Sequence, residues 1–181
     1  NGGFDRPFHE LHDEMLRWFD HWLKGIENGI MEEPPVKIWV RGAEEWRTAH
    51  EWPLSSECDW QRAYLRDGGR LALEDPPVGE EAFETLDYEP QMPVLINPEP
   101  LSPPPNSLAY ETQPFTTEIE IIGPIVLHLH AALSAEDGDF IVTVKGVPPE
   151  GLEFVLSRGW LRASHRELDE GRSEPGRPYL T

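Results

Sequence analysis

Large apolar residues in the first part of the chain recur every three or four positions, which is the spacing of one face of a helix. With about 100° per residue and Leu11 as the origin, seven of them fall within one arc of roughly 160°. They are Leu11, Met15, Leu16, Trp18, Phe19, Trp22 and Leu23. Polar residues fill most of the remaining circumference, and Gly25 follows as a residue suited to ending a helix. The pattern predicts an amphipathic helix over 11–25 with one side made to contact protein.

After this helix the pattern changes to short runs with a period of two. Pro34 and Pro35 close the connector and introduce extended chain. From residue 36 onward, polar and apolar residues alternate between turns rich in Pro, Gly and Asp. The runs that we predict as strands are 36–40, 61–65, 70–73, 82–87, 108–111, 118–122, 125–132, 139–147 and 152–163. Because no helical pattern separates them, we predict a mainly β fold, a jelly-roll β-sandwich preceded by one amphipathic α-helix.

The net charge of the chain limits the kinds of partner that it could bind. Its 34 acidic and 15 basic residues leave a net charge of −19, which would repel the phosphate backbone of a nucleic acid. Its apolar runs are shorter than the roughly 20 residues that span a bilayer, so we expect neither nucleic acid nor membrane as a partner. The single cysteine, Cys58, cannot form an internal disulfide, and no export signal is visible, so we expect a cytoplasmic location. The sequence begins at Asn1 without Met, and we expect a fragment of a longer protein.

Candidate catalytic and metal-binding groups do not converge. His9, His12 and His21 lie in a phrase close to H-E-x-x-H, but helical geometry places them at the edge of the apolar stripe, inside it and outside it. His128 and His130 share one face of a predicted strand without acidic partners at ligand spacing. The G-x-S-x-G elbow of α/β-hydrolases does not occur. We therefore expect no metal, no cofactor and no catalytic residue in this chain.

Two segments combine aromatic or charged residues in ways that suit a contact surface. Segment 36–54 contains three tryptophans, a density typical of a core edge or a contact surface. These are Trp39, Trp46 and Trp52. Segment 159–180 alternates arginines with acidic residues, which suits ion-paired docking and equally a solvated loop. The acidic stretch 136–139 lacks the other ligands of a calcium loop, so a hairpin turn is the better interpretation.

Four phrases of the sequence resemble one known family, in register and in order. They are LHDEMLRWFDHWLKG at 11–25, VKIWVRGAEEWRTAHEWPL at 36–54, residues 108–140, and GWLRASHRELDEGRSEPGRPYL at 159–180. The family consists of serine hydrolases related to cocaine esterase and X-Pro dipeptidyl-peptidase. Its members join an α/β-hydrolase domain with a Ser-Asp-His triad, a helical cap, and a C-terminal jelly roll that packs on both.

This resemblance implies that 1–33 is the terminal helix and linker of an upstream α/β-hydrolase domain and that 34–181 is the C-terminal jelly roll. The triad would lie upstream, so this chain alone should be inactive. The chain would brace the catalytic domain of its parent, an X-Pro dipeptidyl-peptidase or acyl-ester hydrolase, and help to shape the substrate pocket. The implied interdomain contacts are Leu11, Met15, Trp18, Phe19, Trp22, Trp46 and Trp52, and the implied pocket rim is Met92, Val94, Leu95 and Ile96.

The resemblance is incomplete at its end, and one alternative stays open. Family members continue with further strands, so we expect the sandwich to lack its last strands, which a neighbouring chain or a further part of the parent would supply. We also expect a free chain to self-associate through its apolar helix face as a homo-oligomer. The alternative is a free-standing jelly-roll module that binds carbohydrate or peptide. Such a module would bury the helix and leave an aromatic groove open.

Overall fold

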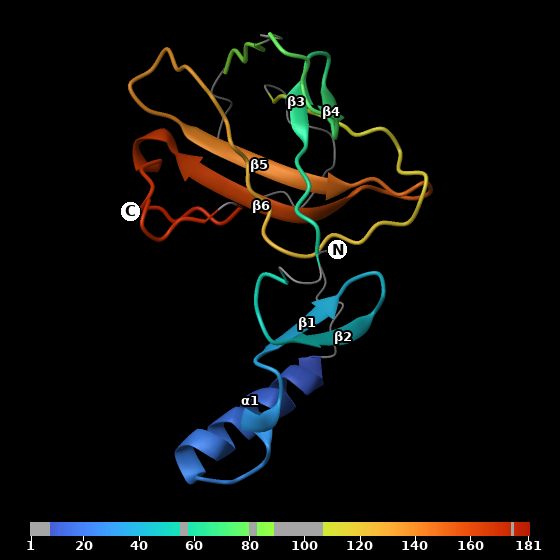
Figure 1. The fold of residues 1–181 in the computed structure, drawn as a ribbon, viewed down its shortest axis with the longest axis vertical. Coiled ribbons are helices and arrows are strands. Elements are labelled where there is room, and N and C mark those ends of the chain that lie inside the picture. Colours follow the sequence, from blue (N-terminus) through green and yellow to red (C-terminus); the bar gives the residue numbers. More distant parts are fainter. Residues whose placement is uncertain (1–7, 55–57, 80–82, 89–106, 175) are drawn as a thin grey trace. The chain divides into compact units, whose positions relative to one another are not determined.

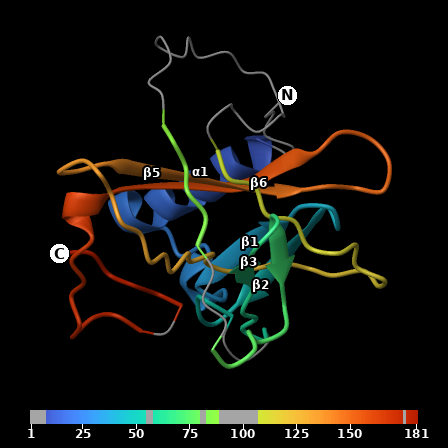
Figure 2. The same cartoon turned by 90° about the horizontal axis from the view of Figure 1, so that it is seen from above.

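The computed structural model describes residues 8–54, 58–79, 83–88, 107–174 and 176–181. Within these ranges it shows one α-helix, two short 3-10 helices and three two-stranded antiparallel sheets (Figures 1 and 2). The chain divides into two compact units, the first Asn1–Asp59 with Ile121–Gly123 and the second Trp60–Glu120 with Pro124–Thr181. None of the described helices is long and apolar enough to cross a membrane.

Helix α1 spans Phe8–Lys24 and confirms the helix predicted from the apolar repeat. Its end is set by Gly25, whose φ of 67° is a left-handed conformation that a residue without a side chain adopts easily. The Gly25 N–H donates to the carbonyl oxygen of His21 at 3.0 Å, which closes the last turn. Lys24 Nζ donates to the carboxylate of Asp20 at 2.6 Å, an i,i+4 pair along the helix surface.

The first hairpin joins β1 (Val36–Val40) to β2 (Glu45–Ala49) in the same unit as α1. Strand β1 has the predicted bounds. Strand β2 was not predicted, because Glu45–Ala49 contains only one large apolar residue, Trp46, and takes its extended form through pairing with β1. The buried apolar side chains of this unit are Val40, Ala49 and Leu54.

The second unit contains a short hairpin of β3 (Tyr64–Arg66) and β4 (Arg70–Ala72). Its turn runs close to a later part of the chain. Leu71 N–H donates to the carbonyl oxygen of Glu111 at 2.7 Å, and Glu111 N–H donates to that of Gly69 at 2.8 Å. A Cβ at Gly69 would lie 2.9 Å from the carbonyl oxygen of Ala109, so this approach requires a glycine.

The longest ladder pairs β5 (Asp139–Gly146) with β6 (Phe154–Arg162), drawn in orange in Figure 1. Strand β5 alternates exposed and half-buried residues along most of its length, which is the period predicted from the sequence. A register irregularity between Val144 and Lys145 interrupts the pairing. The 3-10 helix that follows, Ala163–His165, turns the chain into the C-terminal segment.

The mainly β fold after one helix is confirmed, but the described residues do not show the predicted jelly-roll sandwich. Segments 118–122 and 125–132 carry no assigned ladder, and 108–111 is reduced to a single bridge between Glu111 and Arg70. Of 82–87, the described part forms no strand either. Alternation specifies which side chains would share a face, but it does not specify a partner strand, and a ladder needs both.

Candidate interdomain docking surface

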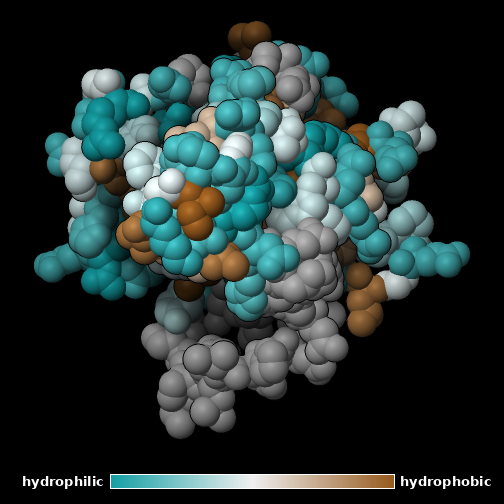
Figure 3. Space-filling model, turned by 90° about the horizontal axis from the view of Figure 1, so that it is seen from below, coloured by the Kyte–Doolittle hydropathy of each residue, from teal (hydrophilic) through white to brown (hydrophobic). Residues whose placement is uncertain are grey.

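The apolar side of α1 is exposed along its described length. Its seven predicted apolar residues have exposed fractions between 37% at Leu11 and 76% at Leu23. Figure 3 shows hydrophobic side chains at the surface beside hydrophilic ones. A contiguous apolar face of this kind marks a contact site in a folded protein more often than a solvated surface. We call the residues Leu11, Met15, Leu16, Trp18, Phe19, Trp22 and Leu23 the apolar face of α1.

Two tryptophans of this apolar face are in contact with each other. The ring centroids of Trp18 and Trp22 lie 5.8 Å apart, with their planes tilted by 51°. The ring of His21 meets Trp22 edge-on at 5.2 Å. Large aromatic side chains of this kind provide most of the contact area in protein interfaces when they insert into a partner. Their placement one turn apart gives the helix a continuous aromatic ridge.

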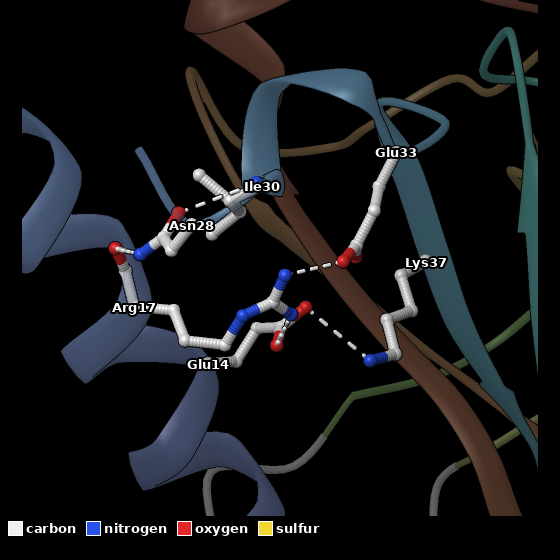
Figure 4. Close-up of polar contacts among 6 residues, drawn as sticks. All are labelled: Glu14, Arg17, Asn28, Ile30, Glu33 and Lys37. Carbon is white, nitrogen blue, oxygen red and sulfur yellow. Dashed lines mark hydrogen bonds and ion pairs between the residues drawn. The ribbon is translucent and has the colours of Figure 1, made fainter. Parts of the chain in front are cut away.

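The opposite side of α1 is attached to the protein's own connector and first strand (Figure 4). Arg17 uses both terminal nitrogens, donating from Nη1 to Glu14 at 3.0 Å and from Nη2 to Glu33. Glu14 also accepts a bond from Lys37 Nζ of β1 at 3.3 Å. We call these four residues the polar clamp, because together they join the helix, the connector and β1.

Asn28 completes the attachment through the backbone. Its Nδ2 donates to the carbonyl oxygen of Arg17 at 2.7 Å, while its Oδ1 accepts a bond from the N–H of Ile30 at 3.3 Å (Figure 4). His21 Nδ1 lies 3.3 Å from the carbonyl oxygen of Ile26. The connector is therefore folded back along the polar side of the helix.

The charges of the polar clamp reinforce one another. The hydrogen bond from Arg17, followed by the attraction of that guanidinium, holds the pKa of Glu33 below its usual range. The same bond raises the pKa of Arg17. Both groups are in contact with solvent, so the effect strengthens an existing contact and does not create a reactive group.

The other residues predicted for interdomain contact belong to the first hairpin and the turn after it. Trp46 is half-buried in the first hairpin, where its ring lies 5.3 Å from that of Trp39 at an angle of 65°. Lys37 Nζ lies 5.3 Å from the centroid of the Trp46 ring. Trp52 is exposed in the turn after β2. The predicted pocket rim, Met92, Val94, Leu95 and Ile96, falls outside the described residues.

The described side chains do not bring the candidate metal ligands together, and the side chain of His9 lies outside them. Within the described ranges, no group of three or more His, Cys, Asp and Glu side chains could hold a metal ion. His128 and His130 are exposed on a segment without an assigned ladder. The thiol of Cys58 is free and half-buried. The predicted hairpin turn at 136–139 is instead bonded to the residues after β6, where Asp137 accepts bonds from the backbone N–H and the hydroxyl of Ser164 at 3.0 and 2.7 Å.

A second apolar exposure lies on the β5–β6 ladder. Ile141 and Trp160 are cross-strand partners and are 75% and 77% exposed. They border an open hollow of about 780 Å³ that also includes Asp139, Arg162 and His165. Arg162 donates two bonds to Asp139, at 2.8 and 2.9 Å, and these lower the pKa of that carboxyl. Phe154 and Leu156 of β6 are also exposed, at 50% and 41%, so the apolar exposure on this ladder extends beyond the pair, and Asp139 and Arg162 border it with polar groups.

The arginine-rich segment 159–180 forms local contacts of its own. The guanidinium carbons of Arg172 and Arg177 lie 4.5 and 5.6 Å from the ring centroid of Tyr179. Asp169 accepts bonds from two backbone N–H groups within its own turn. Arg162 pairs with Asp139 of β5, which lies outside this segment, and Arg166 donates to the carbonyl oxygen of Ala163 at 2.7 Å. The predicted docking role of the segment stays a prediction.

Comparison with known proteins identifies the family of the chain. Residues 28–180 match the family model of the X-Pro dipeptidyl-peptidase C-terminal non-catalytic domain. The chain belongs to this family. This confirms the resemblance that the four phrases indicated.

Three relatives show how much of a parent protein such a chain represents. A Mycobacterium tuberculosis protein named “Putative serine esterase” is 28% identical, covering 93% of this chain and 29% of that protein. The cocaine esterase of a Rhodococcus species is 26% identical, with coverages of 89% and 32%. A Bacillus anthracis “Putative Xaa-Pro dipeptidyl-peptidase” is 26% identical, with coverages of 90% and 28%. The chain therefore spans about a third or less of the relatives that it matches, and no solved structure matches it.

The comparisons also separate α1 from the rest of the chain. The family model begins at residue 28, after the end of α1. Residues 28–181 are 154 of the 181, so a match that covers 93% of the chain must extend upstream of residue 28. The relatives thus resemble this chain beyond the non-catalytic domain itself, in the region that contains the exposed apolar face.

The residues that sequence reasoning missed are those of the polar clamp. Glu14 and Arg17 belong to the polar side predicted for the helix, where their i,i+3 spacing was the only signal available. Their partners Glu33 and Lys37 are far along the chain, and the fold of the connector determines that they meet.

Proposed function

We propose that this chain, as the non-catalytic C-terminal domain of a serine hydrolase, braces the catalytic domain of its parent by docking through the apolar face of α1. The parent would be an X-Pro dipeptidyl-peptidase or an acyl-ester hydrolase, and the β strands after α1 would belong to a jelly roll that helps to shape the substrate pocket. The single observation that carries the proposal is the orientation of α1. Its polar side is bonded to the connector and to β1, and its apolar face is left exposed.

The comparisons support this arrangement. The family is named for a non-catalytic C-terminal domain, and the matched region makes up 29% and 32% of two of the matched relatives. A helix that precedes this domain and shows an apolar side needs protein to cover it. The upstream part of the parent is the occupant to which the chain is covalently linked, and linkage raises the effective concentration of such a contact.

The proposal is tested by producing the upstream portion of the parent protein separately and assaying aryl-ester and X-Pro amide hydrolysis. We expect no turnover from residues 1–181 alone, and we expect addition of the chain to bind and stabilise the upstream portion and to raise its activity. A Trp18→Ser/Trp22→Ser variant of the chain should lose both effects, whereas Lys24→Ser should retain them. Turnover by the chain alone that persists through further purification, or an upstream portion indifferent to the chain, would contradict the proposal.

A further inference from the structure

We propose that Glu14 and Arg17 are positioning residues that fasten α1 to the connector and to β1, so that the docking helix and the first hairpin respond as one body. This inference rests on the proposed docking role of α1. A helix that binds a partner must keep a fixed orientation if it is to hold the rest of the chain against that partner. It adds the residues that set the orientation of α1, and it identifies Trp46 as the side chain whose surroundings should change when that orientation changes.

Arg17 is placed to fix the helix against the connector. Its guanidinium reaches Glu14 on the same helix and Glu33 at the far end of the connector with different nitrogens. A planar guanidinium can satisfy two carboxylates in a fixed geometry, whereas a lysine ammonium on a flexible stem cannot reproduce it. Asn28 holds the middle of the same connector to the carbonyl oxygen of Arg17. The connector is therefore tied to one turn of the helix at two points.

Glu14 extends the attachment from the connector to the sheet. Its carboxylate accepts a bond from Lys37 Nζ at 3.3 Å, and that ammonium lies 5.3 Å from the ring of Trp46. Trp46 in turn lies edge-on to Trp39, its cross-strand partner. These contacts form a continuous path from the back of α1 into the first hairpin, so a change at Glu14 should alter the surroundings of Trp46.

The polar contacts matter because apolar packing holds the helix only in part. The large apolar side chains of α1 are substantially exposed. An isolated exposed ion pair contributes little to stability, but contacts that share partners act together. The shared partners here are Arg17, between two carboxylates, and Glu14, between two bases.

The inference is tested with residues 1–181 labelled with 5-fluorotryptophan, using fluorine NMR and assigning Trp46 by its loss in Trp46→Phe. We expect Glu14→Gln to shift the Trp46 signal, because Lys37 loses its carboxylate partner and moves relative to the ring. The control is Asp20→Asn, which removes the carboxylate of the Asp20–Lys24 pair on the same helix without touching the connector. This control should leave the Trp46 signal in place.

Hydrogen exchange provides an independent readout. Arg17→Ala should raise the exchange rates of the α1 amides several-fold, Arg17→Lys should give an intermediate increase, and Asp20→Asn should have little effect. Should a helix variant fail to fold by circular dichroism, Glu33→Gln tests the same contact from outside the helix. A Trp46 signal unmoved by both Glu14→Gln and Glu33→Gln, or moved as far by Asp20→Asn, would overturn the inference.

All of these measurements use the chain without the upstream portion, so their outcome is separable from docking. The Trp46 signal could respond to Glu14→Gln in a chain that fails to bind the upstream portion. That result would support the positioning role and refute the proposed function. Binding without coupling would refute the positioning role alone.

Discussion

The apolar face of α1 and the Ile141–Trp160 pair on the β5–β6 ladder both expose large apolar side chains, but they differ in extent and framing. The first is a run of seven residues along one side of a helix, with exposed fractions up to 76%. The second centres on one cross-strand pair next to the bonded Asp139 and Arg162, with Phe154 and Leu156 exposed further along β6. Single exposed apolar residues are normal on protein surfaces, whereas contiguous faces indicate partners. The seven residues of α1 lie on one side of one helix and form the more continuous apolar surface, and we take that continuity, more than the exposure of any one residue, as the reason to propose docking through α1.

The largest expected effect comes from removing the aromatic ridge. Trp18→Ser/Trp22→Ser should weaken binding to the upstream portion by at least about 30-fold, because a tryptophan at the centre of an interface commonly contributes about 2 kcal/mol or more. Isothermal titration calorimetry measures the change. Lys24→Ser, on the same helix but outside the apolar face, is the control and should bind as the unmodified chain does.

A steric change in the β5–β6 ladder should affect stability and spare docking. A Cβ at Gly146 would lie 2.5 Å from the ring of Phe154, its cross-strand partner, and this residue is 50% exposed and its ring can shift, so Gly146→Ala should destabilise the second unit by up to about 1 kcal/mol. At Gly159 in β6 no atom lies within 4 Å of the added Cβ, and Gly159→Ala should be neutral or stabilise by up to about 1 kcal/mol. Thermal unfolding distinguishes them, and equal losses from both would refute the packing argument.

Loosening the polar clamp should weaken docking without touching the interface. Arg17→Ala leaves every residue of the apolar face in place, yet it should reduce affinity for the upstream portion by about two- to fivefold, because the helix must then be ordered on binding. The same calorimetric titration measures this effect. An affinity equal to that of the unmodified chain would show that the clamp does not orient the interface.

Acid should release the polar clamp. The folded-state pKa of Glu33 is lowered by the bond from Arg17, so this contact is fully present above the ordinary glutamate pKa of 4.5 and is lost as the pH falls through the lowered value. The fluorine signal of Trp46 should follow this loss below about pH 4.5. Glu33→Gln should remove this part of the pH dependence. If the Trp46 signal of that variant changes with pH as it does in the unmodified chain, a group other than Glu33 is responsible.

The smallest expected effect comes from a substitution on the β5–β6 ladder. Trp160→Ala removes the tryptophan that borders the β5–β6 hollow, and it should leave affinity for the upstream portion unchanged because the proposed docking surface lies on α1. A loss comparable to that of the Trp18→Ser/Trp22→Ser variant would move the docking surface to the sheet.

The features predictable from the sequence are those with a local cause. The spacing of Leu11, Met15 and Trp18 gives the helix and its apolar side without knowledge of any neighbour, and Gly25 marks its end through its own conformational freedom. Strand β1 was predicted because two prolines precede a run of apolar and β-branched residues.

The features that were missed depend on partners remote in the sequence. Strand β2 is extended because β1 pairs with it, and its own residues carry little signal. The polar clamp requires Glu33 and Lys37 to return to the helix, which follows from the path of the connector. Segment 118–122 shows the converse, since its alternation predicts a strand that no described partner pairs with.

The most direct test of the docking surface is tryptophan oxidation footprinting of residues 1–181 by mass spectrometry, with and without the upstream portion of the parent. The account predicts that Trp18 and Trp22 react in the free chain and become protected in the complex, while Trp160 reacts equally in both. Protection of Trp160 with continued oxidation of Trp18 and Trp22 would contradict it.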